Sequence, residues 1–236
     1  MNIAGLQKMT LLDYPGRVAC TVFLSGCNFR CPFCHNSDLL TGNAPSLMSG
    51  EELLAFLEKR KGLLDGVCIT GGEPTLQPQL PQLLSQIKAL GYAIKLDTNG
   101  ARPQMLRSLV EQKLVDYVAM DIKNSREEYA KTTGVSKSLL PDIEESIGFL
   151  LSGKVDYELR TTVVKELHSD ESIQSMGAWV RALGEGNLPA KWFLQSYVDR
   201  DSVLCPDLHA PMKENMENYE RLLAPFANFV ALRGID

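Results

Sequence analysis

Short apolar segments recur along the 236-residue chain, with room for a helix between most neighbouring pairs. They are rich in β-branched and aromatic residues, which is typical of strands buried on both faces of a parallel sheet. The six segments are 18–24, 67–70, 93–97, 117–122, 157–164 and 192–197. Because strands that alternate with helices build a parallel α/β sheet, the pattern predicts an open doubly wound sheet or a partial barrel.

The segments between these strands have the spacing of amphipathic helices. Ser49 is predicted to cap the first of them, because Glu51 and Glu52 follow it in the first turn. Further helices are predicted at 80–90, 103–112, 139–151 and 172–183, and residues 216–229 also have helical spacing. The length suits one domain, and no low-complexity linker divides the chain.

Three of the six cysteines lie within eight residues, as Cys27, Cys31 and Cys34. Three converging thiolates leave a tetrahedral or cubane metal centre one ligand short. His35 directly follows Cys34 and is therefore a poor fourth ligand. A disulfide is disfavoured by the odd count and by the lack of a recognisable secretory segment before the loop. The spacing favours an iron–sulfur cluster with one open iron, while zinc and a redox thiol stay open as alternatives.

Polar residues follow three of the later strands, where the carboxyl ends of parallel strands place functional groups. The paired glycines after the second strand would let the backbone approach a ligand, although an ordinary strand-to-helix turn would also use them. The other two segments also fit a strand-ending turn and a surface ion pair. The three segments are Gly71-Gly72-Glu73-Pro74, Asp97-Thr98-Asn99-Gly100 and Met120-Asp121-Ile122-Lys123.

The three cysteines followed by Gly71-Gly72-Glu73-Pro74 resemble the radical S-adenosylmethionine superfamily. The resemblance implies that Cys27, Cys31 and Cys34 hold a catalytic [4Fe–4S] cluster whose fourth iron binds S-adenosylmethionine. Gly71, Gly72 and Glu73 would support the methionyl amino group. The implied fold is α/β, a partial (β/α)6 barrel of parallel strands with outer helices. The chain would be a single radical SAM domain, 1–236, with a core of about 16–197 and a C-terminal segment of about 199–236 that has no assigned role.

The segments after the third and fourth strands resemble a narrower group, the activases of glycyl-radical enzymes. This resemblance implies a monovalent cation, Na⁺ or K⁺, beside the cofactor's carboxylate, held by Asp97, Thr98, Asp121 and the main-chain carbonyl of Met120. Lys123 would then face the carboxylate or the ribose of S-adenosylmethionine. Arg160 and Gln195, on late strands, are further candidates for binding the cofactor.

The N-terminal part of the chain resembles one subgroup of these activases. Asp13-Tyr14-Pro15-Gly16 is similar to the activase segment beside which the partner's glycine loop enters, so Asp13 is a candidate partner contact. Residues 5–36 are most similar to the longer form of the activating proteins of anaerobic ribonucleoside-triphosphate reductase. The implied function is reductive cleavage of S-adenosylmethionine and removal of a hydrogen from a glycine of that partner. An electron donor such as flavodoxin or ferredoxin is also implied.

Three other functions stay open at this stage. The chain could activate a pyruvate formate-lyase-like enzyme, or it could use radical chemistry on a small molecule. A zinc- or thiol-bearing scaffold that binds a partner without catalysis is the non-enzymatic alternative.

Composition and charge exclude other classes. The net charge is −5 and no long run of Lys or Arg occurs, which disfavours nucleic-acid binding. No apolar run reaches membrane-spanning length, so we expect a cytoplasmic protein that does not bind membranes. Cys20 and Cys68 lie in apolar strands and are predicted to be buried inert thiols, whereas His168 and His209 are predicted to be surface histidines.

Overall fold

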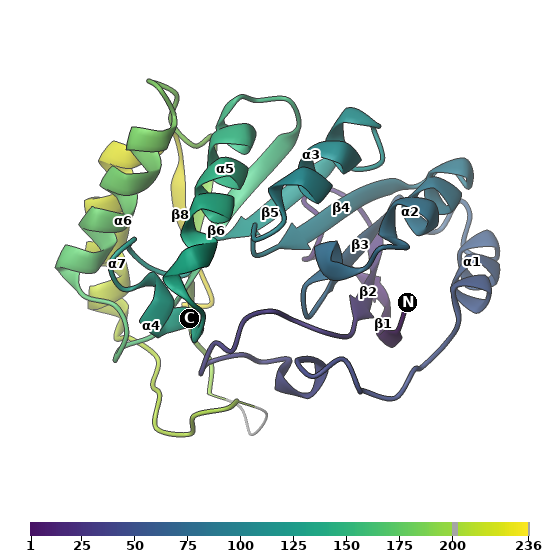
Figure 1. The fold of residues 1–236 in the computed structure, drawn as a ribbon, viewed down its shortest axis with the longest axis horizontal. Helices are drawn as coiled ribbons and strands as arrows, with labels where there is room; N and C mark the ends of the chain where they lie inside the picture. Colours follow the sequence, from purple (N-terminus) through teal and green to yellow (C-terminus); the bar gives the residue numbers. More distant parts are fainter. Residues whose placement is uncertain (200–202, 236) are drawn as a thin grey trace. The chain divides into compact units, whose positions relative to one another are not determined.

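The computed structural model describes residues 1–199 and 203–235 and contains one eight-stranded sheet with helices (Figure 1). The strands are β1 (Ile3–Thr10), β2 (Ala19–Leu24), β3 (Gly66–Gly71), β4 (Ala93–Thr98), β5 (Tyr117–Asp121), β6 (Asp156–Val163), β7 (Trp192–Ser196) and β8 (Val230–Arg233). The α-helices are α1 (Gly50–Glu58), α2 (Leu80–Ala89), α3 (Pro103–Glu111), α4 (Tyr129–Thr133), α5 (Leu140–Leu151), α6 (Asp170–Leu183) and α7 (Lys213–Leu223).

Strand order in the sheet follows the chain from β1 to β8. β1 is antiparallel to β2, whereas β2, β3 and β4 are mutually parallel, as are β6, β7 and β8. The order ends at β1 and β8, so the sheet formed by the described residues is open. The predicted α/β class is therefore confirmed, and its six strands are β2 to β7.

The predicted helices are confirmed with differences at their ends, and the segment predicted at 216–229 forms α7 from Lys213 to Leu223, followed by the short 3-10 helix Ala224–Phe226. Ser49 caps α1 and forms a capping box with Glu52. α6 begins at Asp170, before the predicted start, because Ser169 caps it. Among the described residues, no helix has both the length and the apolar character needed to cross a membrane.

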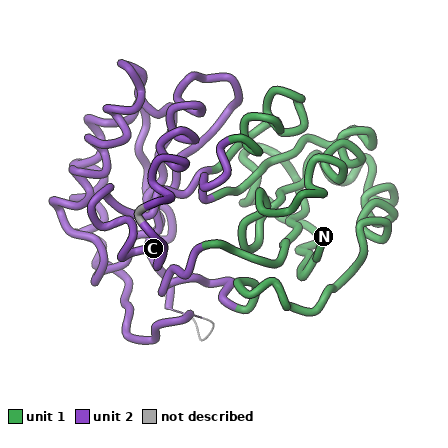
Figure 2. Tube along the Cα trace, in the orientation of Figure 1, with its two compact units in different colours: residues 1–28, 38–98, 104–119 green, residues 29–37, 99–103, 120–236 purple. Residues whose placement is uncertain are grey.

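The chain divides into two compact units (Figure 2). Unit 1 contains Met1–Asn28, Asp38–Thr98 and Gln104–Ala119, and unit 2 contains Phe29–Ser37, Asn99–Pro103 and Met120–Asp236. The division crosses the cysteine loop, so Cys27 belongs to unit 1 while Cys31 and Cys34 belong to unit 2. The single-domain assignment stays a prediction.

Candidate functional site

In unit 1, the cysteine loop begins where β2 ends. Gly26 follows β2 with a φ of 99°, a conformation that favours glycine. Its N–H donates to the Leu39 carbonyl at 2.6 Å, and the N–H of Cys27 donates to the Leu40 carbonyl at 3.1 Å. The backbone at Cys27 is therefore held by a later part of the same loop.

The paired glycines lie against this start of the loop. The N–H of Gly72 donates to the Leu24 carbonyl at 2.8 Å, and that of Glu73 to the Gly26 carbonyl at 2.7 Å. A Cβ on Gly71 would lie 2.2 Å from the Leu24 carbonyl oxygen, and one on Gly72 would lie 2.2 Å from that of Gly26. The glycines thus allow close approach to the protein's own backbone, whereas the sequence suggested approach to a ligand.

Glu73 and Thr98, from two predicted segments, are brought together. Glu73 is 1% exposed, and its Oε1 accepts hydrogen bonds from the Thr75 N–H at 3.1 Å and the Thr75 hydroxyl at 2.5 Å. The Thr98 hydroxyl donates to the same oxygen at 2.7 Å. These donors fix the orientation of a buried carboxylate, and charge-assisted hydrogen bonds of this kind are among the stronger ones.

The other predicted residues of unit 1 also have protein partners. Asp97 forms an ion pair with Lys95, whose side chain is almost fully buried. Asp13 accepts a hydrogen bond from the Thr21 hydroxyl at 2.5 Å, which ties the turn after β1 to β2. Cys20 and Cys68 are buried as predicted, and burial raises the pKa of each thiol to about 12.

In unit 2, Asp121 lies between two cations. Its Oδ2 is 3.0 Å from Lys123 Nζ and its Oδ1 is 3.0 Å from Arg160 Nε. Burial raises the pKa of Asp121, but the charges of Arg160 and Lys123 outweigh it and lower that pKa to about 2. The group therefore carries a net positive charge at neutral pH, which suits an anionic ligand.

Two further predicted residues, Met120 and Gln195, also belong to unit 2. Met120 is fully buried, and a Cβ on Gly100 would lie 2.0 Å from its terminal methyl carbon, so the two residues are in close contact. Gln195 is exposed on β7 opposite Thr162. Because side chains alternate along a strand, Gln195 lies on the same sheet face as Arg160, two residues further along.

The second half of the cysteine loop is held inside unit 2. Phe29 is in edge contact with Tyr129, and the N–H of Arg30 donates to the Thr133 carbonyl at 2.9 Å. Both partners belong to α4. The N–H of Cys34 donates to the Cys31 carbonyl at 3.1 Å, which closes a tight turn between the two cysteines.

Lys123 also approaches this turn. Its ammonium lies 5.9 Å from the centre of the Phe33 ring. Burial raises the pKa of the Cys34 thiol, while the Lys123 charge lowers it by less. The Lys123 charge thus offsets part of the effect of burial, and the pKa of Cys34 stays above its ordinary value.

His168 is a structural residue that the sequence did not reveal. It was predicted at the surface, but it is only 5% exposed. Its Nε2 is 3.0 Å from the Lys123 carbonyl oxygen, and its Nδ1 is 3.1 Å from the Val164 nitrogen. His168 thus links the residues that follow β5 and β6, and no local sequence signal distinguishes it from an exposed loop histidine.

We predict a pH dependence of stability that arises from His168. Burial lowers the pKa of His168, and the nearby carbonyl groups raise it by less. The unfolded state therefore binds a proton first as pH falls below about 6.5, and the free energy of unfolding should fall by at most about 1.4 kcal/mol per pH unit in that window. Denaturant unfolding of the wild type and of His168→Gln across this range measures the effect.

The glutamine variant should show a shallower slope, because it cannot take up the proton. His209→Gln is the matched control, since the His209 side chain is 66% exposed. Equal slopes in the wild type and His168→Gln would contradict the assignment.

Comparison with known proteins identifies the family. The model of the Radical SAM superfamily matches residues 21–171. The chain belongs to the radical SAM superfamily. Its α/β fold is therefore that of a radical SAM enzyme, and membership implies a [4Fe–4S] cluster and S-adenosylmethionine.

Two relatives are similar to much of this chain. A protein of Methanocaldococcus jannaschii, named "Putative glycyl-radical enzyme activating enzyme", is 31% identical over 183 residues, which is 76% of this chain and 75% of that protein. The pyruvate formate-lyase-activating enzyme of Clostridium pasteurianum is 32% identical over 152 residues, covering 62% of this chain and 63% of that enzyme.

The fold is also similar to that of a solved structure. Streptococcus suis SuiB bound to S-adenosylmethionine superposes with a TM-score of 0.69 at 15% identity, over 91% of this chain. The chain spans half the length of SuiB. At this identity the likeness concerns the fold alone.

The residues present fit the cluster that the family implies. None of the six cysteines is in a disulfide, so Cys27, Cys31 and Cys34 are available as thiolate ligands. Soft sulfur donors suit iron–sulfur clusters. In the part of the chain that the structure describes, no three or more His, Cys, Asp or Glu side chains are grouped closely enough to hold a metal ion. The assignment therefore rests on the donor chemistry and the family.

Proposed function

We propose that this radical SAM enzyme activates a glycyl-radical enzyme and that its partner is an anaerobic ribonucleoside-triphosphate reductase. The main support is the similarity to the M. jannaschii protein over three quarters of both chains. The N-terminal resemblance of residues 5–36 supports the choice of partner. An electron donor such as flavodoxin or ferredoxin would reduce the cluster.

Cys27, Cys31 and Cys34 would hold the cluster. When bound, the reduced cluster and S-adenosylmethionine would supply the radical chemistry that removes a hydrogen atom from the partner's glycine. The protein's own residues bind and orient the cofactor and exclude water from the reacting atoms.

The buried Glu73 is suited to accept hydrogen bonds from the methionyl amino group. The hydroxyls of Thr75 and Thr98 already fix its carboxylate. The side chain therefore loses little conformational freedom when a ligand binds. Gly71 and Gly72 contribute by allowing Glu73 to lie against the start of the cysteine loop. This part of the proposal concerns unit 1.

In unit 2, Asp121, Lys123 and Arg160 are suited to the cofactor's carboxylate and ribose. Two cations share one carboxylate, so one positive charge is left for an anionic ligand. Gln195, on the same sheet face as Arg160, is proposed as a further contact.

A monovalent cation beside the cofactor's carboxylate is also part of the proposed site. Asp97 forms an ion pair with Lys95, and Asp121 forms ion pairs with Lys123 and Arg160. A bound Na⁺ or K⁺ would share these carboxylates with protein cations. Thr98 and the Met120 carbonyl would be its uncharged ligands.

Asp13 is proposed to contact the partner's glycine loop. The Thr21 hydroxyl fixes its carboxylate, and the preceding Leu12 is 90% exposed. An exposed apolar residue beside an oriented carboxylate suits a contact with another protein.

Electron paramagnetic resonance tests this function. The reduced protein is incubated anaerobically with S-adenosylmethionine and an anaerobic ribonucleoside-triphosphate reductase. We expect a glycyl-radical signal and one 5′-deoxyadenosine for each radical. The signal should disappear when the reductase's radical glycine is replaced by alanine.

A pyruvate formate-lyase-like enzyme is tested in parallel. A radical on that enzyme alone would identify it as the partner and would contradict the choice of the reductase. Formation of 5′-deoxyadenosine without a radical on either protein would contradict the activase function and favour a small-molecule substrate.

A further inference from the structure

Residues near the C-terminus contact the second half of the cysteine loop, within unit 2. The His35 ring stacks on Tyr197, with ring centres 5.5 Å apart and planes 23° apart. His35 Nε2 lies 2.7 Å from the carbonyl oxygen of Val198. The N–H of Cys205 donates to the Pro32 carbonyl at 3.0 Å. Residues that follow β7 therefore contact the loop on both sides of Cys34, and one of them, Cys205, belongs to the segment to which the sequence assigned no role.

The hydrogen bond to Val198 determines which nitrogen of the His35 ring carries a proton. A carbonyl oxygen can only accept, so Nε2 must carry the proton and donate it to Val198. This nitrogen is therefore engaged in a contact with the protein's own backbone. The stack on Tyr197 fixes the plane of the ring.

The residues before Cys31 are held separately, by α4. Phe29 contacts Tyr129, and Arg30 donates to Thr133. A Cβ on Gly134 would lie 2.9 Å from the Arg30 carbonyl oxygen, so the chain after α4 also lies close to the loop. The loop thus has an anchor on α4 before Cys31 and a second anchor at His35 after Cys34.

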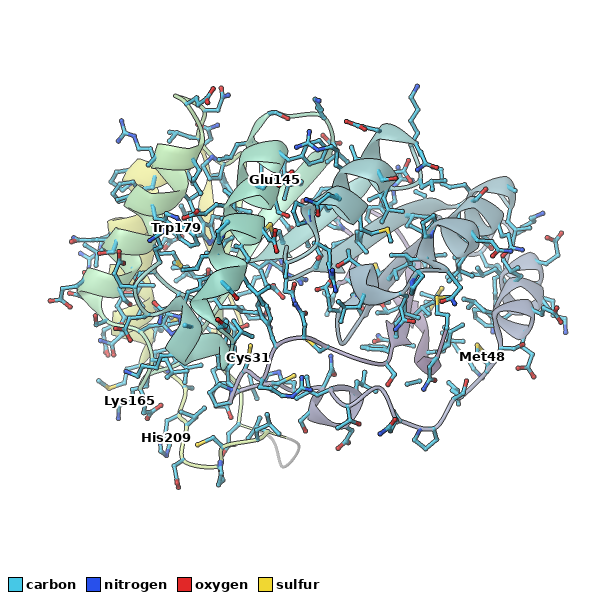
Figure 3. The ribbon with its side chains drawn as sticks, viewed as in Figure 1. Cys31, Met48, Glu145, Lys165, Trp179 and His209 are labelled. Atoms are coloured by element: carbon cyan, nitrogen blue, oxygen red, sulfur yellow. The ribbon has the colours of Figure 1, made fainter. Side chains whose placement is uncertain are left out.

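A third contact supports the second anchor. The N–H of Lys165 donates to the carbonyl of His209 at 3.0 Å, and the backbone N–H of His209 donates to Oε2 of Glu166 at 2.9 Å. Lys165 and His209 are both labelled in Figure 3. Tyr197, whose N–H donates to the Val163 carbonyl at 3.0 Å, and His209 lie on either side of Cys205 in the sequence, and both have contacts within unit 2.

We propose that His35 is a positioning residue for Cys34, acting through Tyr197 and the Val198 carbonyl. His35 directly follows Cys34, so fixing its ring restricts the backbone that carries the thiolate. Loss of the contact would let this part of the loop open more often and would expose its bonds to solvent and chelators. The inference rests on the proposed function, because it assigns Cys34 to a cluster.

The test compares His35→Ala with His35→Gln and His209→Ala. Glutamine can still donate to the Val198 carbonyl but cannot stack on Tyr197. His209→Ala is the matched control, because it removes an exposed imidazole from the same part of the chain and keeps the backbone contact with Lys165. Tyr197→Leu, which removes the stack from the other side, is the second variant.

Hydrogen exchange on the iron-free protein gives the first readout. Loss of one hydrogen bond and one stack is expected to speed exchange in residues 28–37 about tenfold in His35→Ala, equivalent to about 1.4 kcal/mol. Tyr197→Leu and His35→Gln should show smaller increases, and His209→Ala should match the wild type. Exchange in β2 should be unchanged in every variant, which separates loop opening from general unfolding.

The rate at which a ferrous chelator removes iron from the anaerobically reconstituted protein gives the second readout. We expect the same order of variants, with His35→Ala about tenfold faster than the wild type. Equal exchange and equal iron release in His35→Ala and the wild type would overturn the inference. If the wild type itself held no iron, the proposed function would fail, while the exchange data would still show whether His35 fixes the loop.

Discussion

Replacement of Cys27, Cys31 and Cys34 together by alanine should give a folded, colourless protein that cleaves no S-adenosylmethionine. The thiolates are the only proposed protein ligands of the cluster, so the whole rate acceleration, at least about 10⁶-fold, should be lost. The measurement is 5′-deoxyadenosine formed under reducing conditions, together with iron content and circular dichroism. The dichroism should stay close to that of the iron-free wild type.

Cys205→Ala is the matched control for the triple variant. Its thiol lies outside the three-cysteine motif, and its backbone N–H, which contacts Pro32, is kept. This variant should keep its iron and its cleavage activity. Cleavage by the triple variant would refute the cluster assignment, and loss of iron in Cys205→Ala would refute the choice of these three ligands.

Gly72→Ala should destabilise the protein by about 3 kcal/mol or more, because the new Cβ overlaps backbone atoms that cannot rotate away. The nearest atom is the Gly26 carbonyl oxygen, 2.2 Å from the Cβ position. Relief of this overlap must move either the end of β3 or the start of the cysteine loop. Denaturant unfolding of the iron-free protein measures the loss.

Gly50→Ala is the control for this prediction. A Cβ there meets no atom within 4 Å, and Gly50 begins α1, where alanine is well tolerated. Its free energy of unfolding should not fall. If Gly72→Ala were as stable as Gly50→Ala, the close approach of β3 to the loop would be wrong.

The sequence predicted the strands whose burial leaves a strong pattern. β2 to β7 were predicted because their residues are almost continuously apolar, as expected for strands in a parallel sheet. β1 and β8 were not predicted. β1 contains Gly5 and exposed polar residues, and β8 has four residues that are all only partly buried. Such strands depend on their neighbours in the sheet and carry little pattern of their own.

Candidate residues could be predicted from the sequence where they belong to a recognisable motif. The contacts that these residues make could not be predicted. The bond between Thr98 and Glu73 joins residues 25 apart, and that between His35 and Val198 joins residues 163 apart. Pairings over such separations are set by the fold, so no local spacing encodes them. Arg160 was a candidate because it lies on a late strand, and the structure places it against Asp121.

Electron paramagnetic resonance of the reduced, anaerobically purified protein tests the central claim most directly. The protein is measured before and after addition of S-adenosylmethionine. We expect the protein to contain iron and sulfide and to give the signal of one reduced [4Fe–4S] cluster. This signal should change when S-adenosylmethionine binds. A colourless protein that contains zinc, or a cluster signal that the cofactor leaves unchanged, would contradict it.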